Sequence, residues 1–368
     1  MSGRTGPVGV GVIGAGVISD TYLQYLTGFP DVVVHAIGDL NPDAAQTRAT
    51  QHGIACAGGV ALVLDHPDVE VVVNLTVPAA HALVAGQALS AGKHVWNEKP
   101  LTTDLADATD LLARADTAGL RVGCAPDTFL GAGLQTSLRL IEEGVIGDPL
   151  TALVLLQNPG PDLWHPNPAF LFQAGAGPLF DLGPYYLTAL VQAFGPAAWV
   201  TATGSTARAR RTIVSGPRAG EEFDVTVPTH VSATVGFVGG GSATLVLSFE
   251  SPVRRTVLEI TGRDAAMVLP DPNMFGGPVS VQSPEDEAPH VEADTTEVSG
   301  RGTGVLDLAR AIREDRPHRA QGQLALHVLE IMTTIDEALR TSAYVPITST
   351  VERAELLPVD WDPRARTV

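Results

Sequence analysis

Short apolar runs alternate with amphipathic segments along the first third of the chain. The apolar runs have the length of buried β-strands and lie in VGVGVI, VVVHAIGDL, EVVVNLTVP, KHVWNEKP and RVGCAP. Apolar residues at helical spacing separate several of them, in VISDTYLQYL, AAHALVAGQALSAG and DLADATDLLARADTAG. Strands that alternate with helices of this length predict a doubly wound parallel sheet with helices on both faces. In such α/β folds, ligands bind at the carboxyl ends of the strands.

The pattern changes after residue 125. Long β-type segments with few helices between them lie in PLTALVLLQN, AAWVTATGST, FDVTVPTHVSATVGFV, GSATLVLSFES and RRTVLEITG. VGGGS at 238–242 predicts a hairpin turn, and two later helices are predicted in GVLDLARAIRED and QLALHVLEIMTTIDEAL. We therefore expect one domain over 1–125 and a second α/β domain over 126–368 with a large, mostly antiparallel open sheet.

Composition agrees with two globular domains and restricts the partners. The 368 residues are 45% hydrophobic and 17% charged, with a net charge of −18. No arginine cluster is interleaved with aromatics, so we expect no nucleic-acid partner, and we expect the run ARARRT at 207–212 on a solvated loop. No apolar run could span a bilayer and no secretory signal is evident, so we expect a cytoplasmic protein without a membrane partner. Neither Cys56 and Cys124 nor the ten histidines show a metal-ligand spacing, so we expect no metal.

The first strand leads into a glycine turn and then a helix. Gly14 and Gly16 occupy the turn in VIGAGVIS, and Ser19 stands where the usual dinucleotide-binding fingerprint has its third glycine. Glycine permits the sharp turn and lets a pyrophosphate approach the backbone amides at the helix N-terminus. The pattern predicts a Rossmann-type nucleotide site.

Asp39 ends the second predicted strand, 23 positions after Gly16. A carboxylate at this place accepts hydrogen bonds from both ribose hydroxyls and repels a 2′-phosphate, which favours NAD over NADP. The alternative is that Asp39 caps the helix that starts at NPDAA.

Both lysines of the chain lie in AGKHVWNEKPL, whereas the other 21 basic residues are arginines. Burial can lower the pKa of a lysine toward neutrality, whereas arginine stays protonated. We therefore expect Lys99 to take part in catalysis or to orient the substrate. Lys93 follows a helix end and is expected to complement the helix dipole.

The glycine turn, the acidic end of the second strand, TVPAAH at 76–81 and AGKHVWNEKPL together resemble the Gfo/Idh/MocA family of nicotinamide-dependent oxidoreductases, with EKP as the most specific motif. The resemblance runs along most of the chain and implies a dinucleotide-binding domain followed by a domain for substrate binding and self-association, as a dimer or a tetramer. It implies that Lys99 faces the nicotinamide and the reacting hydroxyl. The cofactor contacts it implies are Gly14, Gly16, Val17, Ile18, Asp39, Thr76, His81 and Glu98.

A second chemically dense stretch is AGAGPLFDLGPYYLTAL. Asp181 and Tyr185 are four residues apart at the start of a predicted helix and so share a face. Many family members have histidine at the position of Tyr185, and the glucose–fructose oxidoreductase branch resembles this chain in having tyrosine. An ammonium near the phenol would lower its pKa, so Lys99 and Tyr185 are expected to act together with Asp181. The alternative is that Tyr185 or Tyr186 only packs under the sheet.

The loop DLWHPNP offers Trp164 and His165 to a sugar ring, and His230 is a weaker candidate for the same role. The alternative for His165 is a purely structural role in the loop. We expect an NAD-dependent dehydrogenase that reversibly oxidises a secondary alcohol of a sugar, glycoside or cyclitol. Two alternatives remain at this point: a sugar–sugar oxidoreductase with tightly bound cofactor, and a non-catalytic NAD-binding sensor or scaffold.

Overall fold

The computed structural model describes residues 5–368, which fold into two compact units. The first unit contains the described chain up to Gly131 together with Glu297–Leu329 and Ala354–Val368. The second unit contains Ala132–Thr296 and Glu330–Arg353. The sequence pattern places both late stretches in the second domain, whereas the contacts group them with the first unit. The division of the chain at residue 125 into two domains stays a prediction.

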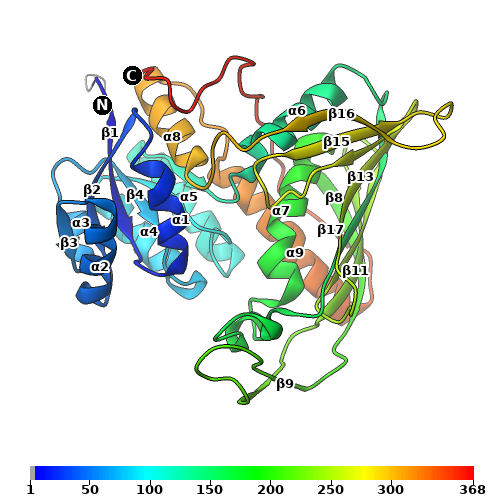
Figure 1. Ribbon diagram of the computed structural model, residues 1–368, viewed down its shortest axis with the longest axis horizontal. Coiled ribbons are helices and arrows are strands. Elements are labelled where there is room, and N and C mark those ends of the chain that lie inside the picture. The colour runs from blue at the N-terminus through cyan, green and yellow to red at the C-terminus, as the bar shows by residue number, and fades with distance from the viewer. Residues whose placement is uncertain (1–4) are drawn as a thin grey trace. The chain divides into compact units, whose positions relative to one another are not determined.

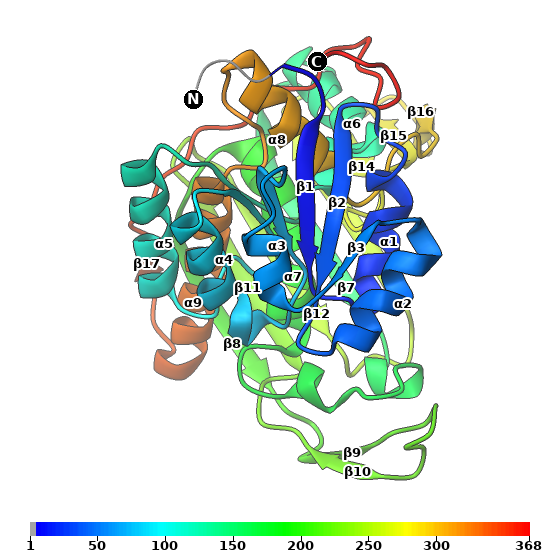
Figure 2. The same ribbon diagram turned by 90° about the vertical axis from the view of Figure 1, so that its left-hand side faces the viewer.

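The first unit is built on a six-stranded parallel sheet with the order β3-β2-β1-β4-β5-β6. Strands β1, β4 and β5 are buried along their whole length, because helices cover both faces of the sheet. Figure 2 shows α1 and α2 on one side of β1 and β2, and α4 and α5 on the other. The strand order reverses between β1 and β4, which is where doubly wound folds bind ligands. The strands are β1 Val8–Ile13, β2 Val32–Gly38, β3 Cys56–Gly58, β4 Val71–Asn74, β5 His94–Asn97 and β6 Val122–Cys124.

The helices of the first unit follow the predicted amphipathic segments. Helix α5 ends at Gly119, whose φ of 64° is the left-handed conformation that favours glycine. Helix α1 buries Tyr22, Leu23 and Leu26, three of the apolar residues that repeat at helical spacing. The helices are α1 Val17–Leu26, α2 Pro42–His52, α3 Val60–Leu64, α4 His81–Ser90, α5 Leu105–Ala118 and α8 Thr303–Glu314, with short 3₁₀ turns η1 Pro78–Ala80 and η2 Thr128–Leu130.

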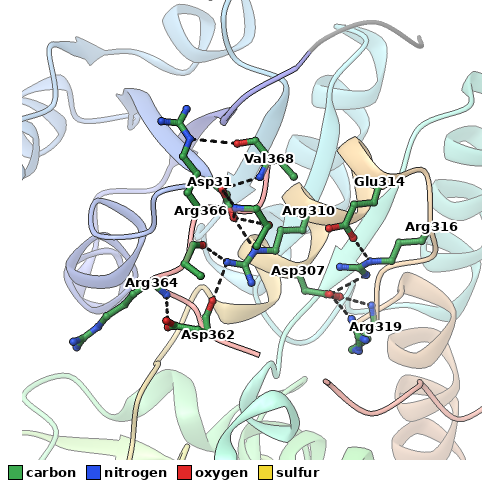
Figure 3. A network of polar contacts seen from close by, with 12 residues as sticks. Asp31, Asp307, Arg310, Glu314, Arg316, Arg319, Asp362, Arg364, Arg366 and Val368 are labelled. Atoms are coloured by element: carbon green, nitrogen blue, oxygen red, sulfur yellow. Dashed lines mark hydrogen bonds and ion pairs between the residues drawn. The ribbon is translucent and has the colours of Figure 1, made fainter. Parts of the chain in front are cut away.

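Asp31 bonds the last residues of the described chain to the rest of the first unit. This residue directly precedes β2 and is fully buried. Its carboxylate accepts hydrogen bonds from Arg310 Nε at 2.8 Å and from the amide and hydroxyl of Thr367 at 3.0 and 2.9 Å. Arg310 also donates to the carbonyl oxygens of Asp362 and Ala365, at 3.0 and 2.7 Å (Figure 3). Residues from three distant parts of the sequence thus meet at one buried carboxylate.

The second unit is built on a nine-stranded sheet with the order β16-β15-β14-β13-β7-β12-β11-β8-β17 (Figure 1). Only β7 and β12 are parallel neighbours, so the expected mostly antiparallel sheet is confirmed. The predicted hairpin at 238–242 joins β11 to β12. The strands are β7 Pro149–Gln157, β8 Ala197–Ser205, β11 His230–Phe237, β12 Ser242–Ser248, β13 Arg255–Gly262, β14 Ala266–Leu269, β15 Gly277–Gln282, β16 His290–Thr295 and β17 Val345–Pro346, with a separate pair β9 Arg210–Thr212 and β10 Glu222–Asp224.

Helices cover one face of the second sheet. Helix α7 packs on β7, β11 and β12, and burial alternates along these strands, as expected when only one face is covered. The helices are α6 Ala132–Glu142 and α7 Gly177–Phe194, with 3₁₀ turns η3 Pro161–Leu163 and η4 Ala169–Phe172, and α9 Gly322–Thr341 continues from the first unit into the second. Within residues 5–368, no helix has both the length and the apolar character needed to cross a bilayer.

Candidate functional site

The turn after β1 has the geometry that a bound diphosphate requires. Gly14 has a φ of 106°, and a Cβ there would lie 2.6 Å from the carbonyl oxygen of Leu75. Gly16 precedes α1 with no side chain capping the helix, and a Cβ there would meet no heavy atom within 4 Å. Open space therefore lies beside Gly16 at the N-terminus of α1, where the helix dipole is positive, and this fits a dinucleotide phosphate.

Asp39 lies beside this turn at the end of β2. Its two carboxylate oxygens accept hydrogen bonds from the amides of Ala15 and Asn41, at 2.7 and 2.8 Å. Helix α2 is capped by the side chain of Asn41, so the structure assigns the capping role to Asn41 and not to Asp39. Each carboxylate oxygen has a further lone pair, and Asp39 is only half-buried, so it can accept hydrogen bonds from a ribose.

Three exposed apolar side chains surround the same edge of the sheet. Val17, Leu40 and Val77 follow β1, β2 and β4 and are 91%, 94% and 67% exposed. Ile18, on the first turn of α1, is half-buried. Exposed apolar residues at a nucleotide-binding edge suit the faces of a base. Leu40 and Val77 were missed from the sequence, although each is an apolar residue placed just beyond a strand end.

Thr76 and His81 connect the loop after β4 to the EKP segment. The hydroxyl of Thr76 donates to Asn74 Oδ1 at 2.7 Å. The ring nitrogens of His81 face the carbonyl oxygens of Pro100 and Thr76, at 2.6 and 3.1 Å, and the side chain is fully buried. In this conformation His81 holds two loops together and presents no surface to a ligand.

The two lysines have different surroundings. Lys99 is half-buried, and its amide donates to Glu98 Oε2 at 2.9 Å. Lys93 is buried, and its ammonium donates to the carbonyl oxygens of His66 and Val69 at 2.9 and 2.8 Å. The expectation that Lys93 complements the dipole of the preceding helix is wrong, because its ammonium is directed to the loop before β4. A compact ammonium can bond two carbonyl groups in one small space.

Asp181 and Tyr185 both lie on α7, as predicted. Asp181 is half-buried and Tyr185 is buried, and both belong to the second unit. The neighbouring Tyr186 is also buried, and burial is the main cause that raises the pKa of its phenol. The roles of Asp181 and Tyr185 in proton transfer stay predictions.

Ring contacts and a hydrogen bond hold the loop that carries Trp164 and His165. Trp164 is 59% exposed, and its ring meets the half-buried His165 edge-on at 5.6 Å, while Phe170 meets His165 at 5.5 Å. Nδ1 of His165 accepts from the amide of Asn167 at 3.0 Å, so the neutral ring carries its proton on Nε2. An indole face beside an N–H donor suits a sugar ring.

Arg211 is bonded to residues at the start of this loop. The guanidinium forms ion pairs with Asp162 at 2.7 Å and Glu250 at 2.9 Å, and it also donates to the carbonyl oxygen of Pro159 at 3.0 Å. Arg208 and Arg210 are exposed, whereas Arg211 is buried, so the expectation that the whole ARARRT run is solvated is wrong for Arg211, the third arginine of the run. The side chain of Arg211 lies on the buried side of β9, and burial alternates along this strand.

His230 is the first residue of β11 and is half-buried, with Ser232 Oγ 3.2 Å from its Nε2. A Cβ on Gly177, at the start of α7, would lie 3.1 Å from the carbonyl oxygen of Pro228. The segment before His230 therefore packs against the start of the helix that carries Asp181 and Tyr185.

A group of possible metal ligands lies elsewhere in the first unit. Among the described residues, ligand atoms of His35, His66 and Asp68 lie within 4.8 Å of one another. Residues 66 and 68 precede β4, at the amino end of that strand, whereas the nucleotide-binding turn is at the carboxyl ends. His66 Nδ1 already accepts from the amide of Asp68 at 3.2 Å. The expectation of no catalytic metal stays a prediction.

Comparison with known proteins agrees with both units. Residues 8–125 match the oxidoreductase family with an NAD-binding Rossmann fold, and residues 134–268 match the GFO/IDH/MocA C-terminal domain. Inositol 2-dehydrogenase 3 of Saccharopolyspora erythraea is 31% identical over 161 residues, which are 43% of this chain and 48% of that protein. The chain spans about half the length of the curated relatives it matches first.

Solved structures show the same fold. Levoglucosan dehydrogenase in complex with NADH and L-sorbose has a TM-score of 0.79 at 21% identity, with 93% of this chain and 99% of that chain covered. Aldose–aldose oxidoreductase from Caulobacter crescentus, complexed with glycerol, has a TM-score of 0.77 at 22% identity, with coverage of 93% and 100%. From these matches and the nucleotide-binding edge, the chain belongs to the Gfo/Idh/MocA family of NAD-binding oxidoreductases.

Proposed function

We propose that this protein is an NAD-dependent dehydrogenase that reversibly oxidises a secondary alcohol of a sugar, glycoside or cyclitol. The observation that carries the proposal is the edge of the first sheet, where an uncapped helix, an open Gly16 and the Asp39 carboxylate adjoin one another. Relatives named as inositol and levoglucosan dehydrogenases support the substrate class.

The residues at this edge fit the parts of NAD. The amides after Gly16 would hold the diphosphate, and Val17, Ile18, Leu40 and Val77 would contact the base and ribose. Asp39 would accept hydrogen bonds from the ribose hydroxyls, which favours NAD over NADP. Thr76 and Glu98 would contact the nicotinamide half, with His81 holding the loops that carry them. The chemistry that NAD supplies when bound is acceptance of a hydride from the carbon being oxidised.

Lys99 is proposed to orient the substrate hydroxyl and to share its proton with Tyr185. A lysine can release a proton, and a phenol near an ammonium becomes a stronger acid, so the two groups would titrate as a pair. Asp181 would orient Tyr185. Tyrosine would thereby replace the histidine of many relatives, as in the glucose–fructose oxidoreductase branch.

The aromatic side chains of the loop with Trp164 and His165 support the proposal of a ring-shaped substrate. Trp164 would stack on the C–H face of a sugar, and Nε2 of His165 would donate to a hydroxyl. His230 is proposed to contact the same substrate.

The test is Lys99→Ala in an assay of NAD and NADP reduction with pyranoses, aryl glycosides and inositols. We expect kcat to fall by at least about a hundredfold, the usual effect of losing a general acid–base group, with the Kd for NAD nearly unchanged. Lys99→Arg keeps the charge but cannot release its proton, so it is expected to be equally impaired. Loss of NAD affinity with unchanged turnover per bound cofactor would refute the catalytic role.

The same assay separates the alternatives. Purified protein that carries stoichiometric nucleotide, which becomes reduced when one sugar is added and reoxidised by another, would indicate a sugar–sugar oxidoreductase. Protein that binds NAD but reduces none with any member of the panel would indicate a sensor or scaffold.

A further inference from the structure

A buried chain of hydrogen bonds lies beneath Lys99. Trp96 Nε1 is 3.3 Å from the hydroxyl oxygen of Tyr22, and this hydroxyl is 2.8 Å from Glu98 Oε1. The other oxygen of Glu98 accepts from the amide of Lys99 at 2.9 Å. Trp96 and Tyr22 are fully buried, and Glu98 is 8% exposed. The chain links helix α1 to the EKP segment within the first unit.

The direction of every bond in this chain is determined by chemistry. The indole nitrogen can only donate, so it must donate to the hydroxyl oxygen of Tyr22. The single proton of that hydroxyl is then left for Glu98, which accepts a donor on each oxygen. Burial, and next the negative charges of Glu98 and Asp127, raise the pKa of Tyr22, so the phenol stays protonated and remains a donor.

Packing prevents the chain from shifting. A Cβ on Gly123 would lie 2.7 Å from the Trp96 ring, so strand β6 contacts the indole directly. A Cβ on Gly304 would overlap the six-membered part of the same indole. The amide of Gly304 is itself held by Asp127 Oδ2, at 3.0 Å. Two backbone segments thus pack closely against the buried indole of Trp96, whose Nε1 donates to the Tyr22 hydroxyl.

We infer that Tyr22 is a positioning residue, which holds the Glu98 carboxylate and through it the backbone orientation of Lys99. The inference deepens the proposed function and rests on it, because it explains how the helix at the nucleotide turn and the reactive lysine are kept in register. Without the Tyr22 hydroxyl, the Glu98 carboxylate keeps only one of these two donors, the amide of Lys99. The carboxylate can then rotate out of its position. Tyr22 does not touch the substrate, and its effect reaches the reaction only through Glu98 and Lys99.

The two lysines make a direct test possible. Protein labelled with ¹⁵N-lysine gives two lysine backbone amide signals, one from Lys99 and one from Lys93, whose amide donates to Ala88 at 3.0 Å. In Tyr22→Phe we expect the Lys99 signal to shift and its hydrogen exchange to accelerate at least tenfold, while the Lys93 signal stays in place. Tyr25→Phe removes a hydroxyl from the same helix and is expected to leave both signals unchanged.

Kinetics complete the test. Losing one hydrogen bond to a buried charged group is expected to lower kcat by about ten- to a hundredfold. The Kd for NAD should change less than about threefold, because the nucleotide-binding amides are untouched. A purely structural role would instead lower the folded fraction and leave kcat per folded molecule unchanged, which would overturn the inference.

The outcomes separate this inference from the proposed function. An unmoved Lys99 signal in Tyr22→Phe would overturn the inference whatever the activity of Lys99→Ala. A shifted Lys99 signal together with full turnover of Lys99→Ala would support the positioning role and refute the catalytic role of Lys99. If Tyr22→Phe does not fold, Glu98→Gln gives the same readout, because an amide cannot accept donors on both atoms; an unmoved Lys99 signal there would equally overturn the inference.

Discussion

Gly14 and Gly16 lie two residues apart in one turn, yet the structure predicts opposite consequences for replacing them with alanine. Gly14 has a φ of 106°, and a methyl group there would meet the backbone of Leu75 at 2.6 Å. Gly16 has a φ of −70°, which any residue adopts, and a methyl group there would have no heavy atom within 4 Å. Gly14→Ala is therefore a test of folding, and Gly16→Ala is a test of nucleotide binding.

The expected magnitudes follow from these surroundings. A positive φ costs a non-glycine residue about 1–2 kcal/mol, and forcing extra atoms into a packed site costs about 1–3 kcal/mol. Gly14→Ala should therefore reduce the free energy of unfolding by about 2–5 kcal/mol. Alanine is a poorer helix cap than glycine, which lowers stability. It also lowers the conformational entropy of the unfolded chain, which raises stability by about 0.4–1 kcal/mol, so the free energy of unfolding of Gly16→Ala should be nearly unchanged.

Binding should show the reverse order. The methyl group of Gly16→Ala projects where the diphosphate would approach the first amides of α1, so we expect the Kd for NAD to rise at least about tenfold, which corresponds to about 1.4 kcal/mol.

Urea unfolding measures the change in the free energy of unfolding. It can be followed by tryptophan fluorescence, because Trp96 of the first unit is buried in the folded protein. Isothermal titration with NAD measures the change in Kd. Unchanged unfolding of Gly14→Ala would refute the packing argument, and wild-type affinity in Gly16→Ala would refute the placement of the diphosphate.

Two further predictions concern buried titratable groups in the first unit. Asp31→Asn leaves Arg310 without its anion, so the free energy of unfolding at pH 7 should fall by about 3–5 kcal/mol in urea titrations, whereas the exposed Asp148→Asn should change nothing measurable. Burial raises the pKa of Asp31, but the hydrogen bonds from Arg310 and Thr367 lower it by more, so the net pKa lies below the unfolded value of 3.8. The stabilisation by this carboxylate is therefore present above the unfolded pKa and is lost as pH falls through the folded pKa. Burial, and next the charge of Arg121, lower the pKa of His94 from 6.5 to about 4. Between pH 6.5 and 4 the ring of His94 is protonated in the unfolded chain but neutral in the folded protein. About 3 kcal/mol of the free energy of unfolding is therefore lost as pH falls from 6.5 to 4. His94→Asn should show a correspondingly weaker pH dependence in urea titrations at pH 7 and 5, and an equal dependence would contradict the assignment.

The fold class was predictable because its signals are local. Apolar runs such as VGVGVI cannot be exposed, and glycine at position 119 ends a helix, whatever the rest of the chain does. The alternation of strands and helices then placed Gly14, Asp39, Thr76 and Lys99 at the carboxyl ends of parallel strands, where the structure has them. The nine-stranded sheet was predicted in type, but β14 to β17 were missed, since short strands with mixed composition have weak local patterns.

What the sequence alone determined is therefore the kind of fold, the glycine turn after β1 and the residues that follow the carboxyl ends of the parallel strands. These features depend on the period of apolar residues, on the conformation of glycine and on the alternation of strands with helices. Only the tertiary structure decided which charges are buried and what they meet. Asp31 and Thr367 are 336 positions apart, Arg211 and Asp162 are 49 apart, and Tyr22 and Glu98 are 76 apart. No local pattern distinguishes Arg211 from its exposed neighbours or assigns the ammonium of Lys93 to a loop. A buried charge is stable only beside its partner, and the fold of the whole chain selects that partner.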